Sequence, residues 1–483
     1  MAYIRRVKTK SGATAVQIAH KRYGVIKQID HIGSAHTEEE LQILLTLARK
    51  CLQGSQQSLF DSPSPHLTIG LQQSSSTVLL DVLSKQYDRL GFGVLDDTDF
   101  LYLCIARLVE PTSKLDSLRV LLDLGVNGID KNRLYRCLQR VIADDYRSQL
   151  AVQCFLEAKR NGIALVLYDV TTLYFEVQQE DDYRKPGMSK ERRLEPQIVL
   201  GLLVDQSGFP LELQSFEGNK AETKTILPII EQFKARHNLT DITVVADAAM
   251  LSRDNLESLV HAGYNYIVGS RLSKVPYDIA EYQRQNDLVD NQIITTKTTI
   301  PGQRIIYQYR VKRALLDMRN IEKQILKAQK IVKGHIPARR AKFLKVTTKE
   351  KMLNQVLIDK ARALVGIKGY VTNLTITDKQ VISYYHELWQ VEHSFRMSKS
   401  DLKARPIFHR KKDAIEAHLT VVFAALAIGR TVEQLTGLSL RHVIKVLRPI
   451  RSGTVVIHGK EYQAEAIIPP AITPLLKRLQ GTN

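Results

Sequence analysis

Cysteine is scarce in this chain of 483 residues, which contains only four, and no two of them have the C-x2-C spacing of zinc and redox sites. This pattern excludes a disulfide-stapled secreted domain and the common zinc-binding folds. All four cysteines lie in apolar, helix-like stretches, which predicts buried thiols in a reducing compartment. They are Cys51, Cys104, Cys137 and Cys154.

Long apolar runs and phosphate-binding loops are missing as well. The first residues, MAYIRRVKTK, have no apolar signal-peptide core, and the longest apolar run, residues 419–428, is about half a membrane span. No GxxxxGK[ST] loop is present, which argues against ATP-driven action. We therefore expect a cytoplasmic protein without a membrane partner.

Acidic residues are outnumbered, with 50 Asp and Glu against 69 Lys and Arg, a net charge of +19 and a pI of about 9.6. Most of this excess lies in residues 301–360, where 16 Lys and Arg face 4 Asp and Glu. A solvated helical face would carry a more balanced set of charges. The lopsided balance predicts contact with a polyanion, and it fits nucleic acid better than a small acidic substrate.

A chain of this length is expected to form several units, because single cores stop growing at about 250 to 300 residues. Alternating strands and a helix open the chain, and a Ser-, Gln- and Pro-rich stretch at 54–76 is typical of a linker. The predicted divisions are 1–60 (β-meander and helix), 77–161 (helical), 162–272 and 372–430 (two parts of an α/β core), 273–371 (basic insertion) and 431–483 (C-terminal region).

Within the helical region, two helices flank a turn at Gly125 and Gly128, and Asp130 caps the second helix. This pattern resembles a DNA-reading helix-turn-helix. The second helix would present three arginines to DNA, although plain helical bundles produce the same pattern. They are Arg133, Arg136 and Arg140.

From residue 162 the apolar pattern changes to strands. An apolar strand at 163–168 ends at Asp169, and another at 241–246 ends at Asp247. The other predicted elements are strands at 197–204, 209–216 and 264–268 and helices at 222–237 and 253–262. This order, followed by a later helix, predicts an α/β fold with a ribonuclease-H-like mixed sheet, helices on both faces and a large insertion before the last helix.

That later helix is predicted over residues 381–405. At 100° per residue, its tyrosine and its cations lie within about 40° of Glu392, and the opposite flank is apolar. The polar stripe consists of Tyr385, Glu392, Arg396, Lys399 and Lys403. An amphipathic surface helix with a solvated charged face would give the same pattern.

Asp169, Asp247 and Glu392 together indicate a particular chemistry. Two-metal phosphoryl transfer needs carboxylates from separate elements to hold two divalent cations about 3.5 to 4 Å apart. Neighbouring strands would end beside each other in the sheet, and the helix would bring the third acid over them. Either aspartate alone is more often a turn or cap residue.

The sequence resembles the Asp-Asp-Glu transposases of insertion sequences, which carry a Tyr-x2-Arg-x3-Glu-x6-Lys signature. Tyr385, Glu392 and Lys399 stand at the signature spacing, and YDVTTLYFE and VVADAAM are similar to the two aspartate blocks. Leu388 occupies the Arg position of the signature. Its phosphate contact is therefore lost or supplied by another cation, for which Arg396 and Lys403 are candidates.

This resemblance implies a transposase that binds the terminal inverted repeats of its element as a homodimer on double-stranded DNA. It would cut and rejoin strands with two Mg²⁺ or Mn²⁺ ions held by Asp169, Asp247 and Glu392, in a bacterial, nucleoid-associated setting. Tyr385 and Lys399 would hold phosphates. Relatives form hairpinned ends, for which Trp389 could stack a displaced base, although core packing is the more common role of a lone Trp.

Two other functions stay open. A domesticated relative could retain the basic surface as an inactive, sequence-specific DNA-binding protein. A nuclease or junction resolvase with a ribonuclease-H fold could cut DNA without joining it, although the long insertion and the separate helical region speak against so limited a task.

Overall fold

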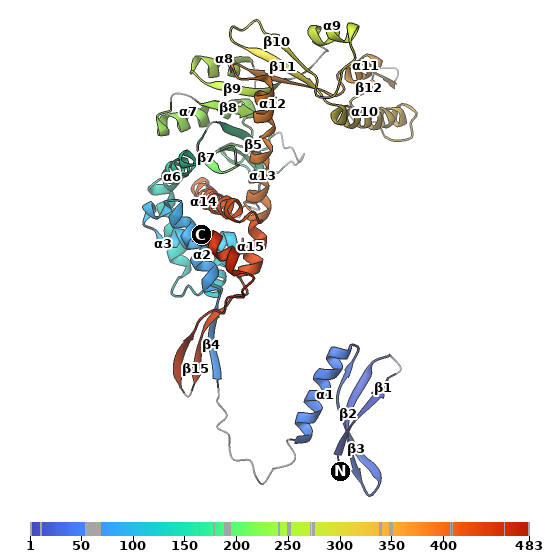
Figure 1. Ribbon diagram of the computed structural model, residues 1–483, viewed down its shortest axis with the longest axis vertical. Helices are drawn as coiled ribbons and strands as arrows, with labels where there is room; N and C mark the ends of the chain where they lie inside the picture. Colours follow the sequence, from blue (N-terminus) through green and yellow to red (C-terminus); the bar gives the residue numbers. More distant parts are fainter. Residues whose placement is uncertain are drawn as a thin grey trace. The chain divides into compact units, whose positions relative to one another are not determined.

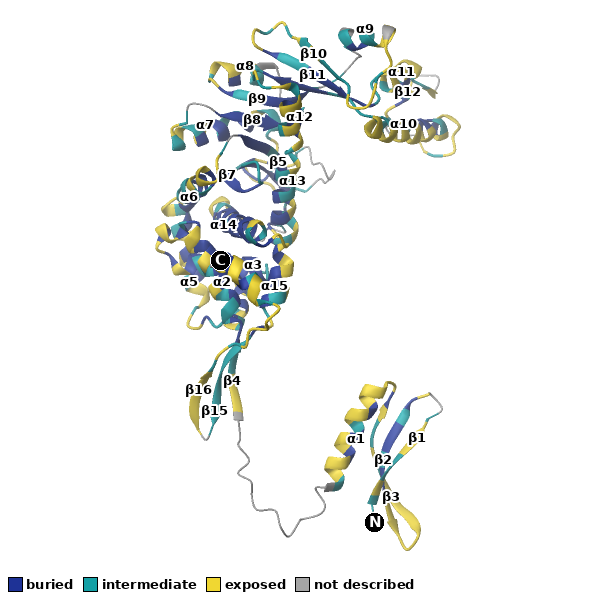
Figure 2. Ribbon diagram, viewed as in Figure 1, coloured by how far each residue is buried: buried dark blue, intermediate teal, exposed yellow. Residues whose placement is uncertain are grey.

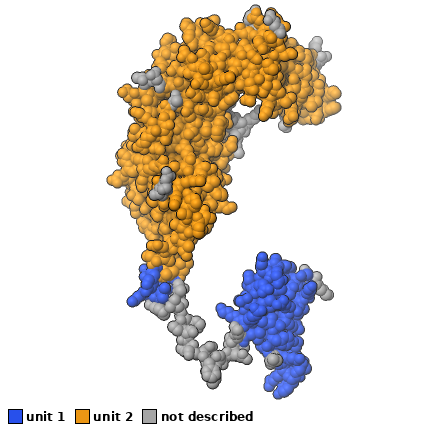
Figure 3. All heavy atoms as spheres, in the orientation of Figure 1, with its two compact units in different colours: residues 1–70, 456–462 blue, residues 71–455, 463–483 orange. Residues whose placement is uncertain are grey.

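The computed structural model describes residues 2–9, 12–53, 69–163, 165–176, 179–187, 195–239, 242–248, 253–270, 272, 276–337, 341–346, 351–405, 407, 409–457 and 459–481. The chain forms two compact units, coloured separately in Figure 3. The first comprises residues 1–70 and 456–462, and the second comprises residues 71–455 and 463–483.

The first unit opens with an antiparallel sheet in the order β1-β2-β3, formed by Ala2–Lys8, Thr14–Arg22 and Val25–Ala35. Helix α1 (Glu38–Gln53) packs on this sheet through Leu41, Leu45 and Ala48. The Thr37 hydroxyl accepts a hydrogen bond from the Glu40 amide, and the Glu40 carboxylate accepts bonds from the His36 and Thr37 amides. This reciprocal cap explains why the helix begins there.

The stretch expected to be a linker contains a strand instead. Residues Ile69–Ser75 form β4, which joins β15 (Ser452–Ile457) and β16 (Lys460–Ala464) in a sheet of order β16-β15-β4. The linker prediction is therefore wrong for 69–75, and residues 54–68 lie outside the described part of the chain. Polar Gln and Ser gave no local sign of a strand whose partner lies about 380 residues away.

A helical layer surrounds one apolar helix, α14 (Lys412–Thr436), which is dark blue in Figure 2. Among the described residues it is the one helix long and apolar enough to span a membrane, but 94% of its most apolar window is buried, as in a core helix. The surrounding elements are α2 (Thr77–Arg89), η1 (Phe92–Leu95), α3 (Thr98–Val109), α4 (Ser117–Asp123), α5 (Lys131–Ala143), α6 (Tyr146–Arg160), α15 (Leu440–Leu447) and α16 (Thr473–Gln480).

Three of the four cysteines are buried in this layer, but Cys51 is exposed on α1. The prediction of four buried thiols is wrong for Cys51. The buried face of α1 is formed by Leu41, Leu45 and Ala48, so the neighbouring positions face water.

Eight strands form the central sheet, in the order β10-β11-β14-β9-β8-β5-β6-β7 (Figure 1). Strands β5, β8 and β9 run parallel, and the other pairs are antiparallel. Their bounds are β5 Val166–Tyr174, β6 Gln197–Val204, β7 Pro210–Glu217, β8 Thr243–Ala246, β9 Asn265–Ser270, β10 Ile293–Lys297, β11 Arg304–Tyr309 and β14 Ile367–Thr372.

Helices pack against this mixed sheet from several parts of the chain. Helices α7 (Ile226–His237) and α8 (Arg253–His261) contact it, as do α12 (Asp378–His386) and α13 (Trp389–Arg396). A short helix η2 (Glu222–Lys224) precedes α7, and the Tyr168 hydroxyl of β5 reaches it by donating to Thr225. The fold is therefore a mixed α/β structure.

The end of one strand differs from the prediction. Strand β5 continues through Asp169 to Tyr174, so that aspartate lies within a strand and faces Leu202 of β6 in the register. The β-branched residues Val170, Thr171 and Thr172, followed by Leu173, favour a strand after Asp169, so one polar side chain does not end it.

The predicted insertion is only partly separate, because β10, β11 and β14 extend the central sheet. Two small clusters hold the remainder, one around Ile321, Ile325 and Phe343 and the other including Ile279. That remainder comprises α9 (Tyr277–Gln285), α10 (Val311–Val332), β12 (Leu344–Val346), β13 (Lys351–Leu353) and α11 (Gln355–Ala363).

The helix predicted over 381–405 is interrupted. Helix α12 begins in a capping box between Thr377 and Gln380, a turn at Glu387 and Leu388 follows, and then α13 leads into a π-helical turn, Met397–Asp401. Lys403 has a φ of 43°, which ends the helical path. The regular 100° rotation used for the prediction does not hold across the turn or the π-helical segment.

Candidate active site

Three acids from separate elements line one cavity of about 270 Å³. Asp169 comes from the middle of β5, and Asp247 directly follows β8. These strands are parallel neighbours in which Tyr168 pairs with Ala246, so the two aspartates occupy the next position on each. Glu392 comes from α13, which packs on β5. We call this the acid cavity; its other lining residues are Tyr168, Lys368, Tyr385, His386, Leu388, Trp389 and Val391.

Asp247 is held by two hydrogen bonds through the same oxygen. The buried Tyr385 hydroxyl donates to its Oδ1 at 2.8 Å, and the Ala248 amide donates at 2.7 Å. Burial and the negative charge of Asp247 raise the pKa of Tyr385, so the phenol stays protonated. Gly269 permits this approach, because a Cβ there would lie 2.6 Å from the Tyr385 hydroxyl. In this structure Tyr385 positions a carboxylate.

Lys368 of β14 also lines the acid cavity, and the sequence analysis missed it. Its Nζ lies 4.2 Å from the centroid of the Tyr385 ring. Burial lowers the pKa of Lys368, as does Arg313, while Asp247 and Glu392 oppose this shift. The available signal was a single Lys inside the apolar strand IKGYVT, but only the pairing of β14 with β9 brings it beside the acids.

The cations of the polar stripe do not line the acid cavity. Arg396 is exposed one turn after Glu392, Lys399 is half-buried in the π-helical turn, and Lys403 is exposed and lines a different cavity. Because the π-helical turn follows α13, Lys399 and Lys403 do not continue the stripe that a regular helix would form with Glu392. Their contacts with DNA stay a prediction.

Trp389 is 58% exposed and lines the acid cavity. Core packing, the more common role of a lone Trp, is therefore wrong for this residue. Its ring faces His393 at a centroid distance of 6.2 Å. An exposed indole at the edge of an acidic site offers a flat apolar surface to a ligand.

Two of the three arginines on α5 have partners within the fold. Arg133 donates to Asp99 at 2.7 Å, and Arg140 donates to both oxygens of Asp97 at 2.8 and 2.9 Å. These pairs fix α5 against α3. Arg136 is exposed. A role of the three in DNA binding stays a prediction.

The acids can be tested for their fit to a metal. Within the described residues, no group of three His, Cys, Asp or Glu side chains that could hold one metal ion was found. Mg²⁺, however, takes one or two carboxylates and completes its shell with water and phosphate oxygens. Asp169, Asp247 and Glu392 are carboxylates that line one cavity, which is the ligand type that Mg²⁺ takes.

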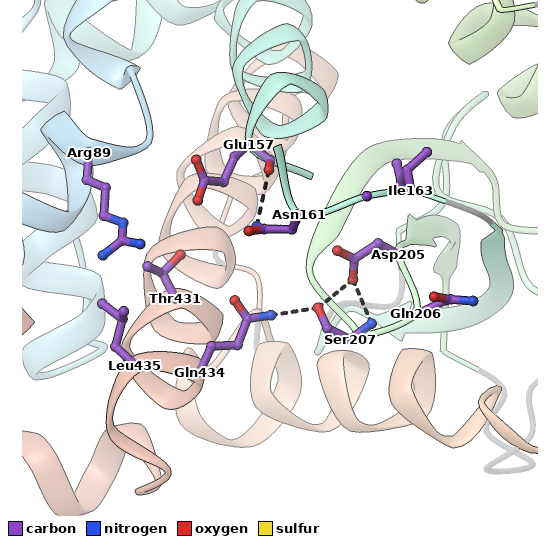
Figure 4. A pocket seen from close by; sticks show the side chains of 11 residues that line it. Arg89, Glu157, Asn161, Ile163, Asp205, Gln206, Ser207, Thr431, Gln434 and Leu435 are labelled. Atoms are coloured by element: carbon purple, nitrogen blue, oxygen red, sulfur yellow. Dashed lines mark hydrogen bonds between the residues drawn. The ribbon is translucent and has the colours of Figure 1, made fainter. Parts of the chain in front are cut away.

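Asp205, an acid that follows β6, has different surroundings. Asp205 lines a separate cavity of about 390 Å³, shown in Figure 4, where none of the three acids appears. Its carboxylate accepts hydrogen bonds from the Ser207 amide, the Ser207 hydroxyl and the Phe209 amide, which close the β6–β7 turn. Burial raises the pKa of Asp205. Its role is structural.

Comparisons with known proteins give the family of the chain. No curated protein matches it. One solved structure, described as a cryo-EM structure of a piggyBac transposase synaptic complex with hairpin DNA, is similar at 11% identity and a TM-score of 0.40, over 73% of this chain and 70% of that one. A likeness this weak carries no argument. A family model described as "Transposase DDE domain" matches residues 160–428, which include Asp169, Asp247 and Glu392. The chain belongs to the family of transposases with a DDE domain.

Proposed function

We propose that the chain is the transposase of a DNA insertion sequence. It binds the terminal inverted repeats of its element and catalyses divalent-metal-dependent strand cleavage and strand transfer in cut-and-paste transposition. The observation that carries this proposal is the acid cavity, where carboxylates from β5, the end of β8 and α13 meet. The order of strands β7-β6-β5-β8-β9 supports a ribonuclease-H-like core.

Asp169, Asp247 and Glu392 would hold two Mg²⁺ or Mn²⁺ ions. Bound there, the ions would supply charge stabilisation for the attacking and the leaving oxygen. Tyr385 fixes the Asp247 carboxylate by donating to it, so that this ligand is already oriented before DNA arrives. The exposed Trp389 would stack a base displaced from a hairpinned end.

Lys368 would take over the phosphate contact that the missing signature Arg makes in relatives. The observation that supports this role is that Leu388 and Lys368 line the same cavity. Lys binds phosphate as a point charge and therefore tolerates an approach from another strand. This assignment replaces Arg396 and Lys403, which do not line the acid cavity.

A second cavity, of about 560 Å³, supports a path for DNA beside the acids. It shares Asp247, Lys368 and Tyr385 with the acid cavity. It extends to Arg313 of α10 and to Lys342, which precedes β12. The basic stretch counted in the sequence thus adjoins the acids. DNA lying there would be held by its phosphates and could be joined to target DNA in a homodimer on paired ends, in the bacterial cytoplasm.

The decisive experiment uses a duplex ending in the inverted repeat that flanks the reading frame. Mg²⁺-dependent nicking at the end, lost in Asp169→Asn and Glu392→Gln, is the expected result. An inactive DNA-binding protein would bind this duplex without cutting it. A nuclease or resolvase would cut it but would not join the 3′ end to a second duplex, so strand-transfer products separate these functions.

A further inference from the structure

A third cavity, of about 500 Å³, shares no lining residue with the acid cavity. Its walls come from the end of α3, the loop to α4, helix α5, the segment after the π-helical turn and helix α14. Among the described lining residues, every charged or imidazole side chain is basic. We call this the basic pocket, after Arg107, Lys114, Lys403, His409 and His418.

Two of these cations are deeply buried, since Arg107 and Lys114 are each 7% exposed. Lys114 Nζ donates to Nδ1 of His418 at 3.0 Å, and Nε2 of His418 donates to the Ala404 carbonyl at 3.2 Å. This chain of bonds requires a neutral imidazole. It uses one of the three ammonium donors of Lys114.

The remaining donors have no partner within the described part of the chain. Lys114 makes no other hydrogen bond there, and the guanidinium of Arg107 makes neither a hydrogen bond nor an ion pair. The nearest acids along the chain are committed elsewhere, because Glu110 and Asp116 both pair with Arg119. The pocket therefore gathers cationic donors of two deeply buried residues without a counter-charge.

Such a cluster lowers the stability of the folded state, because burying a charge without a partner costs free energy. Burial lowers the pKa of Arg107 to about 10 and that of Lys114 well below its usual range. Burial also lowers the pKa of His409 to about 4 and further lowers that of His418. An anion entering the pocket would relieve the repulsion and accept the spare donors.

We propose that the basic pocket binds one backbone phosphate of the DNA on which the protein acts. Arg offers a planar fork of donors and Lys a point charge, which together suit a phosphate. The pocket is open to DNA at the exposed Lys403 and at Tyr135 of α5, which is 46% exposed. The phosphate chemistry follows from the pocket alone, whereas DNA as its source rests on the proposed function.

The chain itself limits the distance to the acids. Lys403 follows Glu392 by eleven residues, mostly along a helical and π-helical path, so their Cα atoms lie roughly 16 Å apart at about 1.5 Å per residue. One DNA strand rises about 3.4 Å per nucleotide. The bound phosphate is therefore expected within about five nucleotides of the phosphate at the acid cavity.

The first arm of the test uses inorganic phosphate as the probe. We expect phosphate to raise the Tm of the full chain by about 3 °C over chloride at equal ionic strength, through mass action on the folded state. Lys114→Met removes a charge while keeping an unbranched side chain, and it should abolish the shift. In chloride this variant should be at least as stable as the wild type, because a buried unpaired charge is gone.

The matched control is Lys85→Gln, which removes the same charge from an exposed position on α2. It should keep the full phosphate shift. If Lys114 serves only to support the fold, Lys114→Met will be destabilised in chloride, and the wild type will show no phosphate shift. That result would overturn the proposal.

The second arm identifies the source of the phosphate. Single neutral methylphosphonates are placed along the end duplex, and affinity is measured in Ca²⁺ with Asp169→Asn so that no cleavage occurs. At one position the substitution should weaken binding about tenfold when Lys114 is present, which is the scale of one charged hydrogen bond. In Lys114→Met the same substitution should have no effect on binding.

The two arms separate the possible failures. A phosphate shift together with coupling at one position supports the proposal. A phosphate shift without coupling at any position overturns DNA as the source and assigns the pocket to a free phosphate compound. Failure of the end duplex to be cut by the wild type would instead count against the proposed function, and the inorganic phosphate result would be unaffected.

Discussion

The acid cavity and the basic pocket each gather charges of one sign, at different depths. Asp247 and Glu392 are exposed and Asp169 is half-buried, whereas Arg107 and Lys114 are each 7% exposed. Water screens repulsion between exposed acids, but buried cations receive little screening. Repulsion within the acid cavity is therefore screened by water before metal and DNA arrive, while the basic pocket strongly favours an anion.

The two sites also differ in their internal partners. In the acid cavity, Tyr385 donates to Asp247, and Lys368 adds a positive charge. In the basic pocket, the only hydrogen-bond partner of Lys114 among the described residues is the neutral His418. One site is thus arranged around residues that position its acids, and the other depends on a ligand from outside. Variants can therefore alter one site at a time, with controls that alter neither.

The largest effect is expected from Asp169→Asn. It removes the charge of a proposed metal ligand while keeping the size of the side chain. The rate of Mg²⁺-dependent nicking should fall by about 1,000-fold, which is the scale of losing a main source of transition-state stabilisation. The rate is measured on the end duplex. Glu281→Gln, an exposed acid on α9, serves as the control and should cut at the wild-type rate. Nicking within tenfold of wild type in Asp169→Asn would refute the assignment of the acid cavity.

Tyr385→Phe tests positioning against direct phosphate contact. Loss of the donor to Asp247 should slow cleavage by about 10- to 100-fold, as for residues that orient metal ligands. Affinity for the end duplex should not change. Because the pKa of Tyr385 is raised, the phenol remains protonated over the usual assay range and adds no pH dependence of its own.

The neighbour Tyr384 provides the matched control, since Tyr384→Phe removes a hydroxyl that does not line the acid cavity. Both variants are compared by single-turnover cleavage and by binding. A parallel loss of DNA affinity in Tyr385→Phe would favour the phosphate contact originally predicted from the signature.

Lys368→Met should weaken cleavage about tenfold, because a charged contact with phosphate is lost. The pKa of Lys368 is lowered, so its ammonium loses its proton as pH rises, at a lower pH than an ordinary Lys. Wild-type cleavage should therefore decline on the alkaline side, and Lys368→Arg, which keeps its charge, should extend activity to higher pH. Identical alkaline limits in wild type and Lys368→Arg would exclude Lys368 as the phosphate ligand.

The sequence contained much of the acid cavity. Apolar strands before Asp169 and Asp247 and the helical stripe around Glu392 placed the three acids on sheet and helix, because burial leaves a local pattern in the chain. The end of β5 was misplaced, because the polar Asp169 was taken as the end of an apolar strand. The turn at Glu387 and Leu388 left no signal, because an averaged period hides a local break.

Contacts between distant segments were beyond sequence reasoning. Lys368 lies 24 residues before Glu392 and reaches the acids only because β14 pairs with β9. On α5, the sequence displayed Arg133 and Arg140 but could not show that Asp99 and Asp97 of the preceding helical segment lie opposite them. The basic pocket joins residues from 107 to 418, and no motif of fixed spacing marks it.

The smallest effect, and the most direct comparison of the two sites, comes from ions of opposite sign. Ca²⁺ should raise the Tm of the wild type by about 2 °C through binding to the folded acid cavity. Glu392→Gln should abolish this shift but keep the phosphate shift, and Lys114→Met should do the reverse. The readout is thermal unfolding in chloride, with either ion added. If one variant lost both the Ca²⁺ and the phosphate response, the two sites would not be independent. The different burial of their charged residues could then not account for the preference of one site for cations and of the other for anions. Because Glu392 is exposed, its removal should change the Tm without ions by little, whereas the same measurement on Lys114→Met reports how strongly a buried charge opposes folding.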